Sequence, residues 1–358
     1  MKRREFLKKA GVVAAASTAF SPNVFAQGGG KMHLEMVTSW PTSLDTIYGG
    51  ALNTAKFINE LTGGDVVVDV YPGGAQVGGL EVYDAVSSGA FALGHTAPYY
   101  YVGKNTAHAF FTAIPFGLNA QQQNAWLESG GGQALWDELN APDNLIAFAA
   151  GNTGVQMGGW FNKEINSLED LQGLKMRIPG LGGKVMTRAG VNVQVLPGGE
   201  IYLSLELGTI DATEWVGPYD DEILGFHKIA QYYYTPGWHE PGPTLGTYVN
   251  LDEWNGMPED IQNTIKIASK AANLQMLADY DAKNGAAFAR IKESGVEVRE
   301  FPAEVLQGLE GHMDDIHSEE VASNADYAKI HAEWSAFRND IRSFHAIQEN
   351  AYANYVFG

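Results

Sequence analysis

The sequence predicts an α/β protein with two similar lobes, followed by a long helical region. Strand and helix patterns alternate in two successive stretches of the chain, which is typical of mainly parallel sheets covered by helices. Apolar segments around residue 150 lead from the first stretch into the second. The chain of 358 residues also exceeds the length of one ordinary domain.

The first stretch shows the alternation clearly. Its expected elements are, in order, a strand at His33–Thr38, a helix at 44–62, a strand at Val66–Tyr71, a helix at 78–89 and a strand at Ala90–Thr96. Residues that interrupt regular structure mark the boundaries: Pro41 follows the first strand, Gly63 and Gly64 the first helix, and Pro72 the second strand.

The second stretch repeats the pattern after a Gly-rich crossing. The expected elements are a buried strand at Leu145–Ala150, a strand at Gln156–Phe161, a short polar helix at Leu168–Leu171 capped by Ser167, a strand at Lys175–Ile178, a helix at about 182–189, a strand at Asn192–Val195, a helix at about 199–207 and a strand at Ala212–Trp215. We therefore expect a second lobe with the architecture of the first.

Long helices complete the chain. One is expected from 258 to 290 and others from 303 to about 350, each opened by a proline with a glutamate close behind it. The last region carries a stripe of apolar residues spaced three or four apart: Trp334, Phe337, Ile341, Phe344 and Ile347. Such a stripe packs either on the protein's own lobes or on a second copy of the chain.

The N-terminus has the order of an export signal. Arg3-Arg4-Glu5-Phe6-Leu7-Lys8 is a twin-arginine consensus, and a short apolar run from Ala10 to Phe20 follows it. Val24-Phe25-Ala26 supplies the small residues that a signal peptidase requires, so residues 1–26 are expected to be a signal peptide cleaved before Gln27. We therefore expect a periplasmic protein exported by the twin-arginine route.

Composition excludes several classes of function. The chain carries 23 Lys and Arg against 42 Asp and Glu, a net charge of −19, which becomes about −23 without residues 1–26. Such a surface disfavours nucleic acid and anionic lipid, and an anionic ligand needs a local cationic or metal site. Cysteine is absent, which rules out disulfides, iron–sulfur clusters and thiolate zinc.

Neither the histidines nor the run of three tyrosines matches a catalytic motif. No His-Glu-x-x-His spacing occurs. His312 and His317 are expected as surface histidines in an acidic helical stretch, and Tyr232-Tyr233-Tyr234 at a lobe surface or an interface. Two lobes joined by crossing strands, without such motifs, favour a hinged protein that closes on a ligand between its lobes.

Charged residues in apolar segments are the candidates for binding that ligand. Arg177 ends a strand, and a guanidinium fits a carboxylate at two points and stays charged when desolvated; the alternative is an ion pair with a carboxylate of the second lobe. Glu214 and Glu240 are costly in apolar settings unless a cation or an arginine compensates them. With the amide oxygen of Gln156, they form an oxygen set suited to Na⁺ or Ca²⁺ rather than zinc. The alternative is that both carboxylates flank a hinge and are hydrogen-bonded to water.

Aromatic residues are expected to complete the pocket. Trp40, Tyr100 and Phe116 follow strand ends, where ligands bind in open sheets, although Trp40 and Phe116 are equally compatible with the core. The strand period makes Tyr99 and Tyr101 point one way and Tyr100 the other. Tyr100 is therefore the candidate that donates a hydroxyl to the ligand.

Several ordered motifs resemble one family. The motifs are Asp170-Leu171-Gln172-Gly173-Leu174-Lys175-Met176-Arg177-Ile178-Pro179-Gly180, Ala189-Gly190, Val195-Leu196-Pro197, Glu200-Ile201-Tyr202 and Gly208-Thr209-Ile210-Asp211-Ala212. They resemble the signature of the solute-binding subunits of tripartite ATP-independent periplasmic (TRAP) transporters, DctP type. The combination of residues 151–156, 212–215 and 237–240 is similar to the branch that binds 2-oxo acids or lactate together with a cation.

The resemblance implies a periplasmic binding protein type II-like fold, with hinge strands between the lobes. Lobe I would comprise 27–152 plus about 242–280, lobe II 153–241 plus about 281–302, and 303–358 the C-terminal helices. In this branch those helices resemble the element that mediates a swapped homodimer, so they are a candidate dimerisation element.

The resemblance also implies a function in transport, not an enzyme. The chain would bind a small 2-oxo acid, such as pyruvate or a longer α-keto acid, and deliver it to small and large membrane subunits. The implied ligand-binding residues are Arg177, Gln156, Tyr100, Trp215 and Asn152. The implied ligands of a cation, Na⁺ or alternatively Ca²⁺, are Gln156, Glu214, Trp215 and Glu240.

Two alternatives stay open. One is a binding protein for another monocarboxylate, such as lactate held with Ca²⁺ or an aromatic or branched acid. The other is a periplasmic hydrolase that uses Glu214 and Glu240 as acid and base on a glycoside or lactone.

Overall fold

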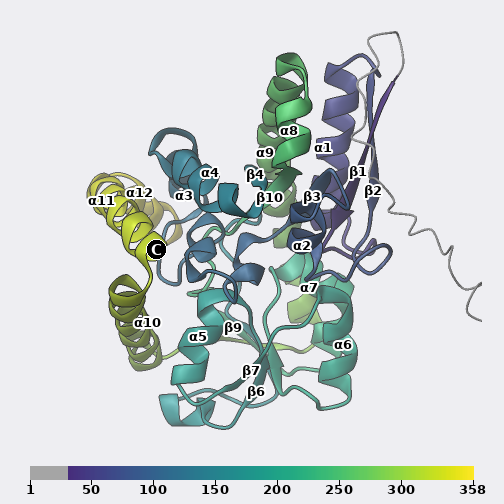
Figure 1. Cartoon of the computed structure of the whole chain (residues 1–358). Coiled ribbons are helices and arrows are strands. Elements are labelled where there is room, and N and C mark those ends of the chain that lie inside the picture. Colours follow the sequence, from purple (N-terminus) through teal and green to yellow (C-terminus); the bar gives the residue numbers. More distant parts are fainter. Residues whose placement is uncertain (1–30) are drawn as a thin grey trace, which may run out of the picture. The chain divides into compact units, whose positions relative to one another are not determined.

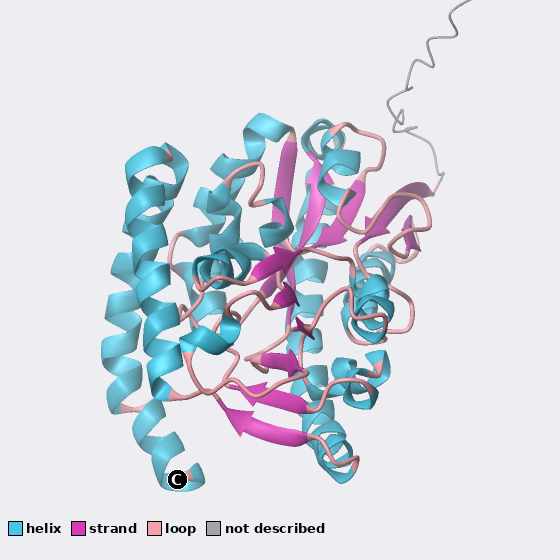
Figure 2. Cartoon of the chain, turned by 90° about the horizontal axis from the view of Figure 1, so that it is seen from below, coloured by secondary structure: helices cyan, strands magenta, loops and turns pink. Residues whose placement is uncertain are grey.

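The computed structural model describes residues 31–358, so the predicted signal peptide lies outside the described residues. The described chain contains two β-sheets with helices packed around them (Figures 1 and 2). We call the part built on the five-stranded sheet lobe I and the part built on the six-stranded sheet lobe II. The predicted α/β class with two lobes is confirmed, while the exact lobe boundaries given above stay predictions.

Lobe I is built on a sheet of order β2-β1-β3-β10-β4. Its strands are β1 (Met32–Thr38), β2 (Val66–Tyr71), β3 (Leu93–Thr96), β4 (Leu145–Asn152) and β10 (Thr244–Asn250). β1 runs parallel to β2 and β3, whereas β10 runs antiparallel to β3 and β4. β4 and β10 are buried at almost every position, which explains the continuous apolar run at the start of β4.

Helices cover this sheet on both sides. The α-helices are α1 (Ile47–Leu61), α2 (Val82–Ser87), α3 (Ala120–Ser129), α4 (Gly132–Asn140) and α8 (Leu251–Gly256), and the 3₁₀ turns are η2 (Pro98–Tyr101), η3 (Thr106–Phe111) and η4 (Ala141–Asp143). α3 begins with a capping box, in which Asn119 and Gln122 exchange side-chain to backbone hydrogen bonds. This box fixes where α3 begins.

Lobe II is built on a sheet of order β11-β9-β5-β8-β6-β7. Its strands are β5 (Gly159–Phe161), β6 (Lys175–Arg177), β7 (Asn192–Gln194), β8 (Ala212–Thr213), β9 (Tyr232–Thr235) and β11 (Glu297–Glu300). Its helices are α5 (Gly180–Arg188), α6 (Gly198–Glu206) and α7 (Pro218–Leu224), with 3₁₀ turns η5 (Leu168–Leu171) and η6 (Phe226–Lys228). β6 pairs in parallel with β7 and β8, and β5 is antiparallel to β8 and β9.

Three connections join the two sheets. Residues 153–158 lead from β4 to β5, and residues 236–243 lead back from β9 to β10. The third is α9 (Glu259–Glu293), a helix of 35 residues that contacts α1 and β4 in lobe I and α7 in lobe II before the chain enters β11. The two crossing loops and one face of α9 therefore form the boundary between the lobes.

Three helices end the chain. α10 (Ala303–Ser323) packs on α5 of lobe II, and α11 (Ala325–Ile347) packs on α3 and η3 of lobe I before α12 (Glu349–Phe357) (Figure 1). Along the predicted stripe, Trp334 is fully buried, whereas Phe344 is 60% and Ile347 77% exposed. No helix within residues 31–358 combines the length and the apolar character that a membrane span requires.

The prediction of mainly parallel sheets is confirmed, although one strand in each sheet, β10 in lobe I and β5 in lobe II, runs antiparallel to both of its neighbours. Other predictions about the fold are wrong. The second crossing strand begins at Gly159 rather than Gln156, since residues 153–158 form a loop. Tyr233 and Tyr234 are buried in β9 rather than exposed. His317 is also buried and bonds the Tyr327 hydroxyl at 2.7 Å, and burial lowers its pKa to about 3.

Candidate functional site

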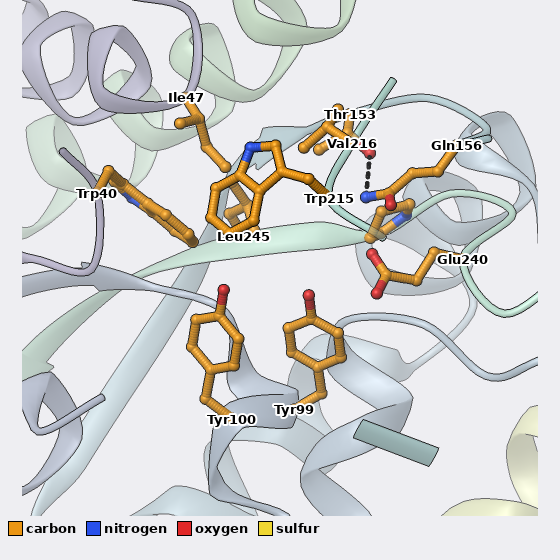
Figure 3. Close-up of a pocket in the computed structure, with 11 residues that line it drawn as sticks. Trp40, Ile47, Tyr99, Tyr100, Thr153, Gln156, Trp215, Val216, Glu240 and Leu245 are labelled. Atoms are coloured by element: carbon orange, nitrogen blue, oxygen red, sulfur yellow. Dashed lines mark hydrogen bonds between the residues drawn. The ribbon is translucent and has the colours of Figure 1, made fainter. Parts of the chain in front are cut away.

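A pocket lies between the two lobes, at the crossing loops (Figure 3). It is lined by Trp40, Ile47, Tyr99, Tyr100, Thr153, Gln156, Trp215, Val216, Glu240, Pro243 and Leu245. Its empty volume is about 260 Å³, counting the opening to solvent. Lobe I, lobe II and both crossing loops contribute to this set, so relative motion of the lobes changes the pocket.

The two crossing loops are bonded to each other. The backbone N–H of Gln156 donates to the carbonyl of Glu240 at 3.1 Å, and that of Thr153 donates to the carbonyl of Pro243 at 3.2 Å. Gly237 allows this close approach, because a Cβ there would lie 2.1 Å from the carbonyl oxygen of Gln156. The pairing places the side chains of Gln156 and Glu240 side by side at the pocket (Figure 3).

Arg177 ends β6 and is 1% exposed. Its Nε donates to the carbonyl of Leu196 at 3.1 Å, and its Nη1 donates to the backbone carbonyl of Glu214 at 3.3 Å and forms an ion pair with the Glu214 carboxylate. Burial alone would lower the pKa of Arg177, but the charge of Glu214 raises it above its usual value. The guanidinium therefore stays charged, and its Nη2 is buried without a hydrogen-bond partner.

Glu214, His239 and Glu240 form an acidic cluster beside Arg177. One ligand atom from each lies within 4.8 Å of the others, and all three residues are buried. Both carboxylate oxygens of Glu240 and the Oε1 of Gln156 are buried without a hydrogen-bond partner. Burial, followed by the charge of Glu214, raises the pKa of Glu240 well above its usual value, although Arg177 opposes this.

The unbonded atoms fit a cation and an anion together. Gln156 and Glu240 present oxygen atoms that lack a donor, and Arg177 presents an N–H group that lacks an acceptor. Oxygen atoms of carboxylates and amides are the ligands that Na⁺ and Ca²⁺ prefer. His239 adds a nitrogen to the cluster, but its Nε2 lies 3.3 Å from Oε2 of Glu214, within reach of a hydrogen bond that orients this carboxylate.

Two tyrosines form one wall of the pocket. Tyr99 and Tyr100 stack with ring centroids 5.0 Å apart, and both hydroxyls point into the pocket (Figure 3). The prediction that they point in opposite directions is wrong, because residues 98–101 form a 3₁₀ turn instead of a strand. Burial raises the pKa of Tyr100 to about 12 and that of Tyr99 well above its usual value, so both hydroxyls remain donors. Tyr101 turns away and donates no hydroxyl to the pocket, since it bonds within lobe I.

Tryptophans form the apolar part of the pocket. The Nε1 of Trp40 donates to Nδ1 of the buried His95 at 2.7 Å, which fixes the Trp40 indole. Trp215 lies edge-on to Trp40 at 6.5 Å, and its ring faces the Arg177 guanidinium at 5.1 Å. Trp40 and Trp215 come from different lobes, so this contact closes the pocket from both sides.

Two predicted residues lie elsewhere. Asn152 does not line this pocket; its Nδ2 donates to the carbonyl of Gly242 and to Thr244, and its Oδ1 accepts from Gly154, so it shapes the crossing loops. Phe116 stacks on Trp238 at 5.4 Å outside the lining set. Gln156, Tyr100, Trp215 and Glu240 line the pocket, while Arg177 faces Trp215 and Glu214 lies close to Glu240, directly beside the lining residues.

Sequence reasoning missed several pocket residues. Ile47, Val216, Pro243 and Leu245 are apolar residues without a distinguishing pattern. Thr153, whose hydroxyl accepts from Nε2 of Gln156 at 3.3 Å, follows the predicted Asn152 directly. His239 stands between Trp238 and Glu240, and this neighbourhood was the one available signal for it.

Known proteins resemble the whole described chain. The family model DctP, described as bacterial extracellular solute-binding protein, family 7, matches residues 36–324. A protein of Nostoc sp. strain PCC 7120 named monocarboxylate 2-oxoacid-binding periplasmic protein is 49% identical over 361 residues, covering 99% of both chains.

Solved structures of TRAP solute-binding proteins are also similar to this chain. A TRAP transporter solute-binding protein from Bordetella bronchiseptica, a mixed-occupancy dimer with copurified calcium and picolinate in one active site, is 43% identical with a TM-score of 0.91, covering 92% of this chain and 98% of that one. A relative from Colwellia psychrerythraea with calcium and pyruvate is 38% identical with a TM-score of 0.88, covering 91% and 99%. One from Pseudoalteromonas atlantica with sodium and pyruvate is 36% identical with a TM-score of 0.88, covering 92% and 100%.

Proposed function

Because this chain belongs to the DctP family of bacterial extracellular solute-binding proteins and is a TRAP solute-binding protein, not an enzyme, we propose that it binds a small 2-oxo acid together with a cation. The observation that carries this proposal is the set of unbonded atoms in one pocket and directly beside it. Arg177 has a free donor, while Gln156 and Glu240 have free acceptors. A carboxylate satisfies the donor and a cation satisfies the acceptors.

The chemistry of this pair favours acids that carry an oxygen at carbon 2, and the named relatives favour a 2-oxo acid among them. Such an acid would offer the cation one carboxylate oxygen and its 2-oxo oxygen, while Arg177 would donate to its carboxylate. The Tyr99 and Tyr100 hydroxyls supply further donors on the same side. Trp40, Ile47 and Leu245 then surround the remaining side chain of the acid, and the small volume favours short acids such as pyruvate. A longer α-keto acid needs these apolar residues to move.

Charge balance bears on the choice of cation. With both carboxylates ionised, Arg177, Glu214 and Glu240 sum to one negative charge, and a monocarboxylate adds another. A divalent cation neutralises this buried cluster, whereas Na⁺ leaves one negative charge, which is costly away from water. We therefore favour Ca²⁺ over the Na⁺ expected from the sequence. Gln156, Glu214 and Glu240 would hold the cation through side chains, and Trp215 through its carbonyl.

An aromatic acid is the second candidate ligand. The relative from Bordetella bronchiseptica contains picolinate with calcium. In this chain Trp40, Tyr100 and Trp215 provide aromatic faces around the pocket, with Trp40 and Tyr100 at 6.2 Å. A planar aromatic carboxylate with a donor atom next to the carboxyl group would use the same chelate.

The delivery of the ligand follows from the family. We propose that the protein is exported to the periplasm by the twin-arginine signal in residues 1–26 and hands its ligand to small and large membrane subunits. We also propose a homodimer formed through the C-terminal helices, whose apolar side chains Phe344, Ile347 and Tyr355 are exposed in this chain. The mixed-occupancy dimer of the Bordetella relative supports this proposal.

Thermal unfolding tests the ligand class. The protein without residues 1–26 is denatured and refolded to remove any carried-over ligand, then heated with pyruvate, longer 2-oxo acids, lactate, picolinate or dicarboxylates, each with Na⁺, Ca²⁺ or a chelator. A ligand that binds the folded state raises its stability by about 2.7 kcal/mol at a hundredfold excess over Kd. We expect the largest shift for pyruvate with Ca²⁺. Shifts for dicarboxylates alone, or equal shifts in chelator, would contradict the proposal.

A further inference from the structure

Two adjacent aspartates are buried in lobe II, behind the pocket. Asp220 and Asp221 lie in the first turn of α7 and are 0% and 1% exposed. Each accepts hydrogen bonds from a tryptophan and a tyrosine. Nothing in the binding chemistry above uses either carboxylate, although burying a carboxylate is costly.

The two carboxylates accept hydrogen bonds from different parts of the protein. Oδ2 of Asp221 accepts from Nε1 of Trp160 at 2.9 Å and from the hydroxyl of Tyr233 at 2.6 Å, both within lobe II. Oδ2 of Asp220 accepts from Nε1 of Trp215 at 3.1 Å and from the hydroxyl of Tyr280 on α9 at 2.8 Å. Asp220 therefore connects a pocket residue to the helix that contacts both lobes.

Trp215 has three further neighbours besides Asp220. Its ring faces the Arg177 guanidinium at 5.1 Å and Trp40 of lobe I at 6.5 Å. Gly198 lies behind it, where a Cβ would be 2.4 Å from the indole. The Nε1–H bond to Asp220 is the polar contact that sets the rotation of the indole in this packed space.

A contribution to the stability of the fold explains the burial of Asp221 better than the burial of Asp220. Oδ1 of Asp220 is buried without a hydrogen-bond partner, so half of this carboxylate is desolvated without compensation. Oδ1 of Asp221, in contrast, lies 3.4 Å from the backbone N–H of Val216. The carboxylate with the less favourable environment is the one that contacts the pocket wall.

We propose that Asp220 is a positioning residue for ligand binding, which fixes the Trp215 indole at the pocket and ties it to Tyr280 of α9. The inference rests on the proposed 2-oxo acid function. With the indole fixed, the Trp215 ring keeps both its contact with Arg177 and the shape of the apolar wall. Loss of the acceptor leaves the indole N–H and the Tyr280 hydroxyl unpaired, and the indole no longer has a single orientation.

A double-mutant cycle of Asp220 and Trp215 tests the inference. Pyruvate is titrated calorimetrically, with Ca²⁺ present, into the full mature chain and into Asp220→Leu, Trp215→Phe and the double variant. Asp220→Leu is expected to weaken binding by about tenfold or more, since it leaves the buried N–H of Trp215 without an acceptor. In the Trp215→Phe background, which lacks the N–H, the same substitution is expected to change Kd by less than about twofold. The proposal would be overturned if the fold change in Kd of the double variant equalled the product of the fold changes of the two single variants.

Two further variants separate positioning from general stability. Asp220→Asn keeps an acceptor oxygen for Trp215 and Tyr280, so its Kd is expected within about threefold of the parent protein. Tyr233→Phe removes the equally buried bond to Asp221, and it is expected to lower the unfolding temperature without changing Kd. A Kd for Asp220→Asn as weak as that of Asp220→Leu would contradict a role through the acceptor.

The outcomes distinguish this inference from the proposed function. If the parent protein itself gives no binding with pyruvate or any other 2-oxo acid, the proposed function fails. If the parent protein binds and the cycle is additive, the proposed function stands and the positioning role of Asp220 fails. Should Asp220→Leu not fold, Trp215→Phe and Tyr280→Phe replace it, because each removes one donor to the same oxygen. The proposal then expects the first to weaken binding at least about tenfold and the second less than threefold; equal effects would overturn it.

Discussion

Arg177 and Glu214 form an ion pair inside the protein, with side chains 1% and 0% exposed. The same guanidinium nitrogen also donates to the backbone carbonyl of Glu214, so Glu214 holds Arg177 against the pocket residue Trp215. Its second terminal nitrogen is left for a ligand. The pair thus joins the residue expected to bind the acid to a residue expected to bind the cation.

Breaking this pair on one side is expected to cost more than removing both sides. Arg177→Met leaves the buried Glu214 carboxylate without its partner, which costs about 3–5 kcal/mol of unfolding free energy. The double variant Arg177→Met/Glu214→Gln is expected to recover most of that loss but to bind no 2-oxo acid. Urea unfolding measures the stability and calorimetry measures the binding. A double variant less stable than Arg177→Met would contradict the pairing.

Glu240→Gln is expected to stabilise the protein in chelator but to reduce its stabilisation by Ca²⁺ and pyruvate. The carboxylate is buried without hydrogen bonds, so replacing it is expected to raise the unfolding free energy in chelator by about 1–3 kcal/mol. With Ca²⁺ and pyruvate, the variant gains less stability than the parent protein, because its amide oxygen can still contact the cation but lacks the negative charge of the carboxylate. Glu200→Gln, at an exposed position, is the matched control and is expected to change neither value. A variant that is stabilised by Ca²⁺ and pyruvate as much as the parent would exclude Glu240 from the cation site.

Stability is expected to fall as pH rises from about 4 to 7. Burial raises the pKa of Asp220 and of Asp221 to about 7, although hydrogen bonds from Tyr280 and Tyr233 oppose the shift. Over this range the folded state binds more protons than the unfolded state, so the unfolding free energy decreases with pH. Asp221→Asn is expected to reduce the slope, as measured by urea unfolding at several pH values. An unchanged slope would show that Asp221 does not titrate in this range.

The C-terminal helices are expected to hold a dimer together. Ile347 and Tyr355 are 77% and 87% exposed, and large exposed apolar groups of this kind mark interaction surfaces. Ile347→Glu/Tyr355→Glu is expected to convert a dimer into a monomer by light scattering, with the Kd for pyruvate unchanged. Leu207→Glu, at a 70% exposed position in lobe II, is the matched control and is expected to leave the dimer intact. A parent protein that runs as a monomer would contradict the proposal directly.

The sequence predicted much of the architecture because its strands and helices are strongly patterned. The strand at His33–Thr38 and the helix at 44–62 appear almost where expected, since Pro41 and Gly63 mark their limits. β9 was missed because three consecutive tyrosines show no alternation of polar and apolar residues. α3 was missed because Gln121, Gln122 and Gln123 give its first turns no apolar face.

In the candidate site too, some residues could be predicted from the sequence and others could not. Arg177, Glu214 and Glu240 were predicted because charges in apolar segments require compensation. The direction of Tyr99 was not predictable from a strand period, since a 3₁₀ turn replaces the strand there. The role of Asp220 depends on Tyr280, which is 60 residues away in the sequence, and such a contact is set by tertiary packing.

Calorimetric titration of pyruvate into the refolded protein tests the central claim most directly. The account predicts one site per chain and binding at least about tenfold tighter with Ca²⁺ than with a chelator, because the acid and the cation share one buried site. Equal affinity in both conditions would contradict a shared site. The absence of binding heat for every 2-oxo acid, with either cation, would contradict the proposed ligand class.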